Sequence, residues 1–330
     1  MSERATVAQG AQIGVEATPG TAVPAKTILD ALSFTMGIGG TAAEFRPDGH
    51  KFPSLTLPGK EWTDVPYTGK GCYRAMGYIL DSLIAKATPT AAGTGWQRVY
   101  APQDTNEDTR LTYTLEKGSS VRAASASSLF FASLAMTLSR DTFDVSGDVV
   151  AKLLGDGITM TGSPSTVSAS PIMPRDFDVY VDDTAAALGN TKLLRDFTAD
   201  VNLGPLIQPI WPLDSTQTSF ASVVEIAAAT TVTLGFAAIA ESSDFIDAFR
   251  DGRTKFVRIE AKGNVLTAGT PPVTELFRID VALKMTTPGQ QQDIDGVYGW
   301  KPQFVVVQDG TWGKAIELTV INDVASYLPA

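Results

Sequence analysis

Apolar residues alternate with polar ones, or run without interruption, over strand-length segments along most of the chain. Alternation with a period of two places every second side chain on one face of a β-strand. Gly, Pro, Ser and Thr between these segments favour turns. The segments are residues 111–115, 129–138, 143–154, 177–181, 222–236, 256–259, 276–285, 304–307 and 316–321. This pattern predicts a mainly β fold.

Two segments have the period of an α-helix. Apolar residues of the first recur at three- and four-residue steps and share one face: Cys72, Met76, Ile79, Leu80, Leu83 and Ile84. The second is a shorter helix that Ser242 or Ser243 can cap and that ends before Gly252. Its expected buried side chains are Phe245, Ile246 and Phe249. Both helices are expected to cover sheets.

The second half of the chain resembles the first. Aligning residues 129–138 with 276–285 pairs Phe130 with Phe277, Ala132 with Ile279, Leu134 with Val281, Met136 with Leu283, and Leu138 with Met285. After a two-residue insertion, residues 144–147 align with 293–296. Each hairpin follows a strand that ends near a Lys-Gly pair, and one helix lies upstream of each. This order indicates a duplicated unit, and chance similarity between alternating strands is the competing explanation.

The expected domain boundaries follow from one polar segment. Residues 161–171, TGSPSTVSASP, contain no large apolar residue except Val167, which is typical of a linker. Residues 1–30 show little periodic pattern and are predicted to form an extended N-terminal arm. The expected organisation is therefore an arm at 1–30, a first domain at 31–162, a linker at 163–171 and a second domain at 172–330.

Charge is unevenly distributed between the two halves. Residues 1–165 carry 14 basic and 16 acidic groups, and residues 166–330 carry 12 and 20, so the second half holds -8 of the net -10. Tight binding of nucleic acid depends on Lys and Arg that displace counterions from phosphates. The composition therefore argues against nucleic-acid binding as the main function.

The compartment is indicated by cysteine usage and hydropathy. Cys72 is the only cysteine, which excludes an internal disulfide framework and a cysteine-cluster metal site. The N-terminus has no apolar signal segment, and four residues, Thr230, Thr231, Thr233 and Gly235, interrupt the longest apolar stretch, 226–240. We expect cytoplasmic folding, without secretion or a membrane span.

Residues suited to catalysis or nucleotide binding are few. His50 is the only histidine and lies in the turn sequence at 46–50, where an exposed loop residue is the preferred interpretation. Cys72 follows Gly-Lys-Gly at a helix start, a position that can activate a thiol, but its place on the apolar face predicts burial. The glycine clusters at 37–40 and 69–71 lack the spacing of nucleotide-binding loops.

Carboxylates cluster at two places, at Asp176, Asp178, Asp182 and Asp183 and again at Asp293 and Asp295. No Glu follows the second pair at the distance a calcium loop requires, so a hairpin turn is preferred. The tryptophans, Trp62, Trp96, Trp211, Trp300 and Trp312, have no interleaved basic residues and are expected to be core or interface anchors. We predict no catalytic, cofactor-binding or metal-binding residues.

Several short segments, in their order along the chain, resemble the major tail tube proteins of long-tailed bacteriophages. They cover almost the whole chain, and each is a weak motif alone. They are GVEATPGTA at 14–22, residues 62–86 with the predicted helix, TYTLEKG at 112–118, VYVDD at 179–183, FVRIEAKG at 256–263, DIDGVY at 293–298 and TVIN at 319–322.

The resemblance implies a fold and a set of partners. The fold would be two β-sandwich domains, each with a flanking helix, whose strands join those of other subunits in a β-barrel around a channel for DNA. Duplicated members can form trimeric, pseudo-hexameric rings, which the internal repeat favours over hexamers. Implied partners are a tape-measure protein, a tail terminator and a baseplate or distal tail protein. The implied location is the virion tail, after assembly in the host bacterial cytoplasm.

Two alternatives belong to other classes. The chain could be another self-assembling phage structural protein, such as a head-decoration protein. It could also be a hydrolase that uses the clustered carboxylates, including Asp176 and Asp178. Long strands with open edges favour assembly, because ring closure pairs each edge with a neighbour.

Overall fold

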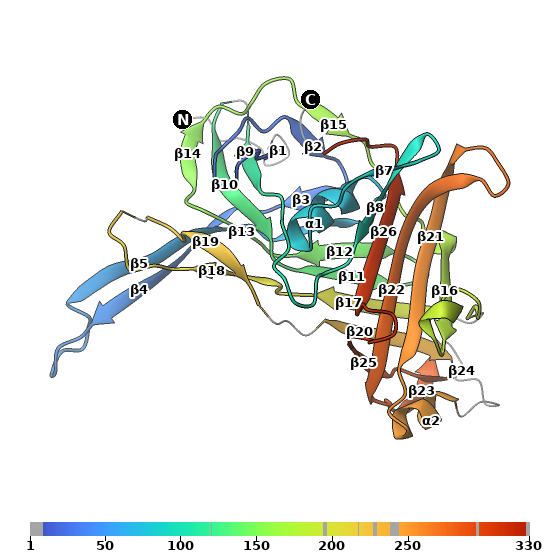
Figure 1. Cartoon of the computed structure of the whole chain (residues 1–330). Coiled ribbons are helices and arrows are strands. Elements are labelled where there is room, and N and C mark those ends of the chain that lie inside the picture. Colours follow the sequence, from blue (N-terminus) through green and yellow to red (C-terminus); the bar gives the residue numbers. More distant parts are fainter. Residues whose placement is uncertain are drawn as a thin grey trace.

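The computed structural model describes residues 9–119, 121–193, 197–216, 218–226, 230–237, 244–294 and 297–327. The predicted mainly β fold is confirmed, and α1 (Ala75–Leu83) and α2 (Asp244–Arg250) are the α-helices of these residues (Figure 1). Short 3-10 helices lie at Pro174–Asp176 and Ala185–Ala187.

In the described part of the chain, the first sheet has the strand order β15-β2-β1-β9-β10-β13-β5-β4, with β14 paired to β10. The strands are β1 (Gly10–Val15), β2 (Thr27–Leu29), β4 (Gly37–Phe45), β5 (Leu55–Asp64), β9 (Tyr113–Gly118), β10 (Ala123–Phe131), β13 (Val149–Ala151), β14 (Gly155–Ile158) and β15 (Ser165–Val167). Both outer positions of this order, β15 and β4, belong to exposed segments.

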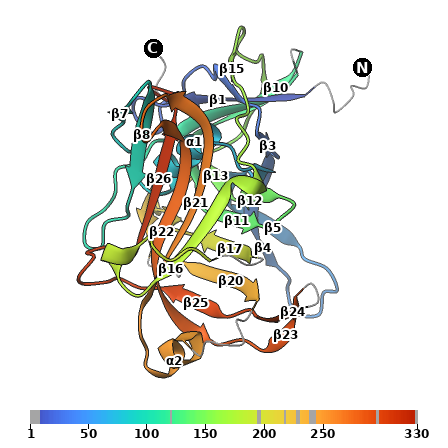
Figure 2. The ribbon, with the colours of Figure 1, turned by 90° about the vertical axis from the view of Figure 1, so that its right-hand side faces the viewer.

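The second sheet has the order β3-β6-β12-β11-β17-β20-β25-β22-β26-β8-β7. Its strands are β3 (Leu32–Phe34), β6 (Tyr67–Lys70), β7 (Thr90–Ala92), β8 (Gly95–Tyr100), β11 (Leu134–Leu138), β12 (Phe143–Gly147), β17 (Phe197–Leu203), β20 (Thr231–Ala237), β22 (Val273–Thr287), β25 (Gln303–Val306) and β26 (Ile316–Asn322). Four more strands join beside this path: β16 (Phe177–Asp182), β21 (Lys255–Thr267), β23 (Gln291–Ile294) and β24 (Val297–Trp300). Figure 2 shows β16, β21, β22, β26 and β8 as one layer.

One strand order occurs twice in the second sheet. In β3-β6-β12-β11 the first, second, fourth and third strands along the chain are neighbours, and β17-β20-β25-β22 repeats that order. One helix follows the second strand each time, α1 after β6 and α2 after β20. We call these two groups of four strands the first and the second strand set. Antiparallel pairing of β11 with β17 joins them, with Ala135 opposite Asn202. The eight antiparallel strands thus form one continuous surface, which we call the eight-stranded run.

Helix α1 lies in the core, as its apolar face predicts. All nine of its residues are buried, and Ile79, Leu80 and Leu83 have no exposed side-chain surface. In α2, Ala248 is buried, whereas Phe249 is 38% exposed, so the prediction that Phe249 is buried is wrong. This helix has only seven residues, and its narrow contact face does not extend to Phe249. Ser242, Ser243 and the side chain of Phe245 lie outside the described residues.

Residues 10–29 belong to the first sheet and do not form a free arm. Strand β1 pairs with β9 along its whole length, from Gly10 opposite Gly118 to Val15 opposite Tyr113. Ile13 and Val15 are buried in the main core, which explains why this segment stays on its own chain. Residues 1–8 lie outside the described residues. In the expected linker, β15 pairs in parallel with β2.

The gapless alignment of the two halves is wrong over its first part. Phe277 and Ile279 lie in the main core, but their counterparts Phe130 and Ala132 form a small separate cluster with Ile207. The chain leaves the strand conformation between β10 and β11, and this break moves the buried face by one residue. After the break, Leu134 and Met136 are core residues, as are their counterparts.

The second hairpin is longer than its counterpart in the first half. Strand β12 pairs with β11, but β23, which was aligned with β12, pairs with β24 and with no other strand of the described residues. The place beside β22 is taken by β25, so Phe304 opposite Met285 corresponds to Phe143 opposite Leu138. The aligned Asp295 and Gly296 lie outside the described residues.

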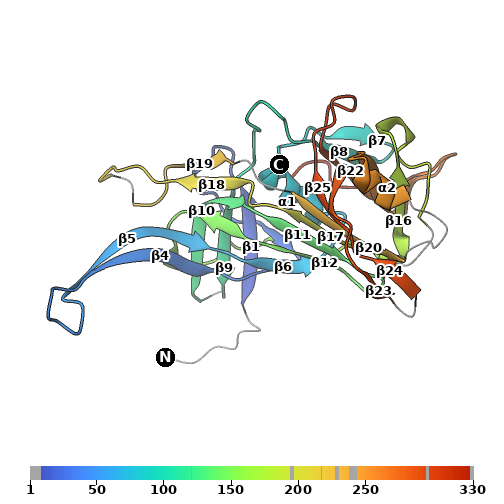
Figure 3. The ribbon, with the colours of Figure 1, turned by 90° about the horizontal axis from the view of Figure 1, so that it is seen from below.

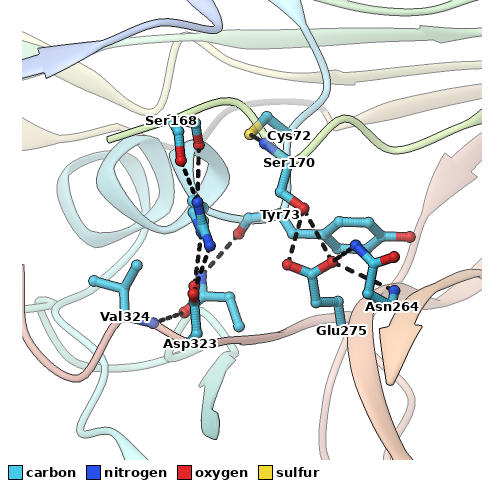
Figure 4. Close-up of polar contacts among 10 residues, drawn as sticks. Cys72, Tyr73, Ser168, Ser170, Asn264, Glu275, Asp323 and Val324 are labelled. Carbon is cyan, nitrogen blue, oxygen red and sulfur yellow. Dashed lines mark hydrogen bonds and ion pairs between the residues drawn. The ribbon is translucent and has the colours of Figure 1, made fainter. Parts of the chain in front are cut away.

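A buried polar network connects the segment between the two strand sets to α1 and the second sheet (Figure 4). The Ser170 hydroxyl donates to both oxygens of Glu275 at 2.9 Å, and Asn264 Nδ2 donates to one of them at 2.9 Å. The Ser170 N–H donates to Cys72 Sγ at 3.0 Å. Ser170 therefore fixes this segment against both neighbours, which supports a rigid connection between the strand sets.

Asp81 makes stability depend on pH. Burial raises the pKa of this α1 carboxyl to about 6, although the Ala87 N–H, 3.0 Å from Oδ1, partly offsets the shift. Because the pKa is higher in the folded state, Asp81 favours folding below pH 4, and this contribution disappears as pH rises through 6. The loss amounts to about 3 kcal/mol.

The Asp81→Asn variant should lack this dependence. We expect its free energy of unfolding, measured with urea between about pH 4 and pH 7, to fall less with rising pH than that of the wild type. Asp48→Asn, on an exposed loop, is the matched control and should follow the wild type. Parallel curves for wild type and Asp81→Asn would show that Asp81 does not carry the effect.

Candidate functional site

The surface of the eight-stranded run that faces away from the core is polar and continuous. One row of directly opposed residues crosses all eight strands: Ser33, Thr68, Ser146, Ala135, Asn202, Thr231, Val305 and Lys284. A second row crosses six: Lys70, Asp144, Thr137, Asp200, Thr233 and Gln303. All fourteen are exposed or half-buried. We call this surface the polar face.

The polar face is nearly neutral. Its charged residues are Lys70, Lys284, Asp144 and Asp200. Lys70 and Asp144 form an ion pair, with Nζ and Oδ1 2.5 Å apart. Small hydroxyl and amide side chains make up most of the remainder, and no aromatic residue lies in either row. The acidic excess of the second half is therefore located elsewhere. Such a surface has neither the excess of cations nor the stacking groups that hold nucleic acid.

The two ends of the eight-stranded run have unpaired edges in the described structure. Strand β3 pairs only with β6 on its one side, and the β3 carbonyl of Phe34 accepts a hydrogen bond from Lys117 Nζ. At the other end, β21 stops pairing at Lys255 opposite Leu283, so no described strand lies beside residues 284–287 on that side. Unpaired edges invite pairing with another chain.

The β4–β5 hairpin projects from the body of the protein (Figure 1). Its pairing continues that of β3 and β6, and one face of its outer half is apolar because Phe45 lies opposite Leu55 and Ala43 opposite Leu57. Phe45 is 60% exposed, and Phe52 in the connecting loop is 79% exposed. A two-stranded hairpin is marginal in water by itself. This exposed apolar face is the strongest sign of a binding surface.

A second hairpin, β18 (Ile207–Ile210) and β19 (Ser222–Glu225), projects on the same side (Figure 3). It occupies the place between β17 and β20 that β4–β5 occupies between β3 and β6. The rings of Trp211 and Trp62 pack edge to face, with their centroids 5.8 Å apart. The Ser219 hydroxyl donates a hydrogen bond to the Glu61 carbonyl at 2.8 Å. The second hairpin and its connecting loop thus pack against the base of the β4–β5 hairpin.

A cleft of about 250 Å³ lies beside the second hairpin, between the second strand set and the segment that runs from the end of α1 to Arg110. Its apolar lining includes Ile84, Leu203, Leu206 and Ile316, and its polar lining includes Asp108, Arg110 and Glu225. Arg110 forms an ion pair with Glu225 and donates to the Leu83 carbonyl at 3.1 Å. Burial raises the pKa of Asp108, and the nearby Glu225 adds to this rise.

The structure separates most of the candidate residues of the sequence. His50 is exposed in the β4–β5 loop and Cys72 is 1% exposed, as predicted. The carboxylates near β16 serve different partners, since Asp178 pairs with Lys192 and Asp183 pairs with Lys255. Asp293 lies on β23, and Asp295 lies outside the described residues.

The tryptophans are all half-buried, and within the described residues Trp62, Trp211 and Trp312 contact another aromatic ring. Trp62 and Trp211 contact one another, and Trp312 contacts Phe256 edge to face at 6.1 Å. Trp96 lies on β8 and Trp300 on β24. The interpretation as anchors therefore fits the packing of these three rings.

Three buried carboxylates have structural roles that the sequence pattern did not predict. Glu16 is 2% exposed and accepts hydrogen bonds from the N–H groups of Gly20 and Ser128 and the hydroxyls of Thr112 and Thr114, at 2.7 to 2.9 Å. The other two acceptors are Glu116, which binds Ala25 and Thr161, and Asp182, which binds Gly189, Asn190 and Thr191. Only the position of Glu16 and Asp182 at the end of a strand, before a turn, hinted at this role.

Comparisons with known proteins add no relative. No model of a protein family matches the chain, and no curated protein matches it at a significant level. Within the described residues, no three metal-binding side chains come together, and neither helix has the length and apolar character to cross a bilayer.

Proposed function

We propose that this chain is a structural subunit that assembles into stacked rings around a channel, as a major tail tube protein of a long-tailed bacteriophage does. The observation that carries the proposal is the repeated strand order together with its internal junction. The pairing of β11 with β17 shows how one strand set joins the next within a chain. The free edges at β3 and at residues 284–287 allow the same kind of junction between chains.

The proposed ring has three chains and six strand sets. Each set, with its helix and the strands packed behind it, corresponds to one β-sandwich domain. Joining residues 284–287 of one chain to β3 of the next would close the eight-stranded runs into a barrel, with both free edges of each run paired. A chain with two sets needs three copies to form six sectors. Because the two hairpins of one chain differ from each other, the ring has threefold and not sixfold symmetry.

The polar face would line the channel. Its near-neutral rows offer no cluster of cations to hold phosphates, so DNA would pass without tight binding. The projecting β4–β5 hairpin would contact the adjacent ring, which would cover its apolar residues. Further proposed partners are a tape-measure protein within the channel, and a tail terminator and a baseplate or distal tail protein at the ends. The proposed role requires no catalysis and no cofactor.

Disulfide trapping tests the proposed junction. Ser33 and Lys284 lie at opposite ends of one row of the polar face, so ring closure brings Ser33 of one copy near Lys284 of the next. We expect the double variant Ser33→Cys, Lys284→Cys to form linked dimers and trimers under oxidising conditions, seen on non-reducing gels. Cys72 is buried and does not compete.

The internal junction supplies the matched control. Ala135 and Asn202 lie directly opposite each other within one chain, so Ala135→Cys with Asn202→Cys should form a disulfide that leaves the chain monomeric on the gel. Assembled particles in which the Ser33 and Lys284 positions do not cross-link would refute this junction. Flat sheets or isolated monomers in place of tubes would favour a decoration-type protein.

A further inference from the structure

We infer that the cleft beside the second hairpin is the receptor for the β4–β5 loop of a second copy, with Phe52 in its apolar interior and Lys51 beside Asp108. This inference rests on the proposed function and identifies the contact between adjacent rings. Each chain carries this loop and this cleft, so every copy can donate a loop and receive one. A head-to-tail contact of this kind propagates along a stack.

The cleft has the chemistry of a receptor for an aromatic side chain. Its interior is lined by aliphatic residues, among them Ile84 at the end of α1, Leu203 at the end of β17 and Leu206 just before β18. The volume of about 250 Å³ is many times the space that a water molecule needs. Moving an apolar side chain from water into a partly enclosed apolar cleft of this size displaces water from both surfaces and is therefore favourable.

The rim of the cleft is acidic on one side. Arg110 is already engaged with Glu225 and the Leu83 carbonyl, whereas the Asp108 carboxylate accepts a hydrogen bond from the Gln103 N–H at 3.3 Å. Asp108 is half-buried, so its charge is poorly solvated. A cation from a partner would stabilise this charge more than it would a fully exposed carboxylate.

The loop has the complementary chemistry. Phe52 is 79% exposed and follows Lys51, which is also exposed and forms no ion pair in the described residues. The left-handed conformation of Gly49, with φ of 79°, turns the loop so that the segment 50–52 stands at the end of the hairpin. An exposed aromatic residue beside a cation therefore meets an apolar cleft beside a carboxylate that forms no ion pair within the described residues.

Charge reversal provides the sharpest test. Lys51→Glu should raise the critical concentration for assembly, measured by sedimentation, about tenfold or more, and Asp108→Lys should do the same. The double variant Lys51→Glu, Asp108→Lys restores the opposite charges and should assemble within about threefold of the wild type. A double variant no better than the worse single variant would overturn the pairing.

Phe52→Ala keeps the test decisive if Asp108→Lys fails to fold, because Phe52 is almost fully exposed in the subunit. We expect the same loss of assembly, with an unchanged melting temperature. Val121→Ala, at a residue 59% exposed on a different turn, is the matched control and should assemble normally. Normal assembly of both Phe52→Ala and Lys51→Glu would overturn the docking but leave the ring proposal intact, whereas a wild type that never assembles would overturn both.

Discussion

Replacing residues 42–59 with Asn-Gly should leave a folded subunit that no longer assembles. The replacement removes the outer part of the β4–β5 hairpin and joins Thr41 to Lys60 through a turn suited to a two-residue hairpin. The removed residues are exposed, apart from the half-buried Pro47, and none of them belongs to either core cluster. The melting temperature should therefore stay within a few degrees, about the range of a change below 1 kcal/mol.

The loss of assembly should be nearly complete, because the apolar residues most exposed to water on this hairpin would be absent. Sedimentation and electron microscopy provide the measurement. Substituting Phe45, Leu55 and Leu57 with Ser should have the same effect. Glu44→Ala with Thr56→Ala alters the opposite, polar face of the hairpin and should assemble as the wild type does. Tubes of normal length from the shortened chain would disprove a role for the hairpin in stacking.

Glu16→Ala should strongly reduce the free energy of unfolding of the subunit. Four donors converge on this carboxylate, and two of them are backbone N–H groups, of Gly20 and Ser128. Removing the acceptor leaves buried donors without a partner, and we expect a loss of about 3 to 5 kcal/mol. Urea unfolding measured by circular dichroism gives this value.

Two companion variants separate the hydrogen bonds of Glu16 from its bulk. Glu16→Gln keeps one acceptor oxygen and should lose less stability than Glu16→Ala. Glu44→Ala removes an exposed carboxylate and should change the free energy of unfolding by about 0.5 kcal/mol or less. A loss at Glu16 as small as that at Glu44 would show that the hydrogen bonds of this carboxylate do not hold the first sheet together.

Local sequence patterns predicted where helices and strands lie better than they predicted which side chains of a strand face the core. Alternation identified the β-rich fold, and the spacing of Met76, Ile79, Leu80 and Leu83 located α1. The alignment of the halves went wrong at Ala132 because a break in a strand reverses which residues face the core, and alternation on either side of the break looks the same. The strand at 10–15 was missed because Gly-rich, partly polar segments give little periodic signal.

The candidate surfaces depend on pairings that no single segment encodes. The row from Ser33 to Lys284 exists only once eight strands are in register, so the polar face could not be recognised from any one strand. The buried carboxylates were missed for the same reason, since three of the four donors to Glu16 come from two distant segments, at residues 112–114 and at Ser128. The exposed loop around His50 was predicted, because Pro, Asp and Gly in that segment favour a turn whatever surrounds it.

Electron microscopy of the purified wild-type protein, with averaging of end-on views, tests the ring most directly. A subunit with two joined strand sets and two free edges should form hollow tubes whose rings each contain three chains and show six similar sectors around the channel. Protein that stays monomeric at high concentration, or rings built from six chains, would contradict the proposed assembly.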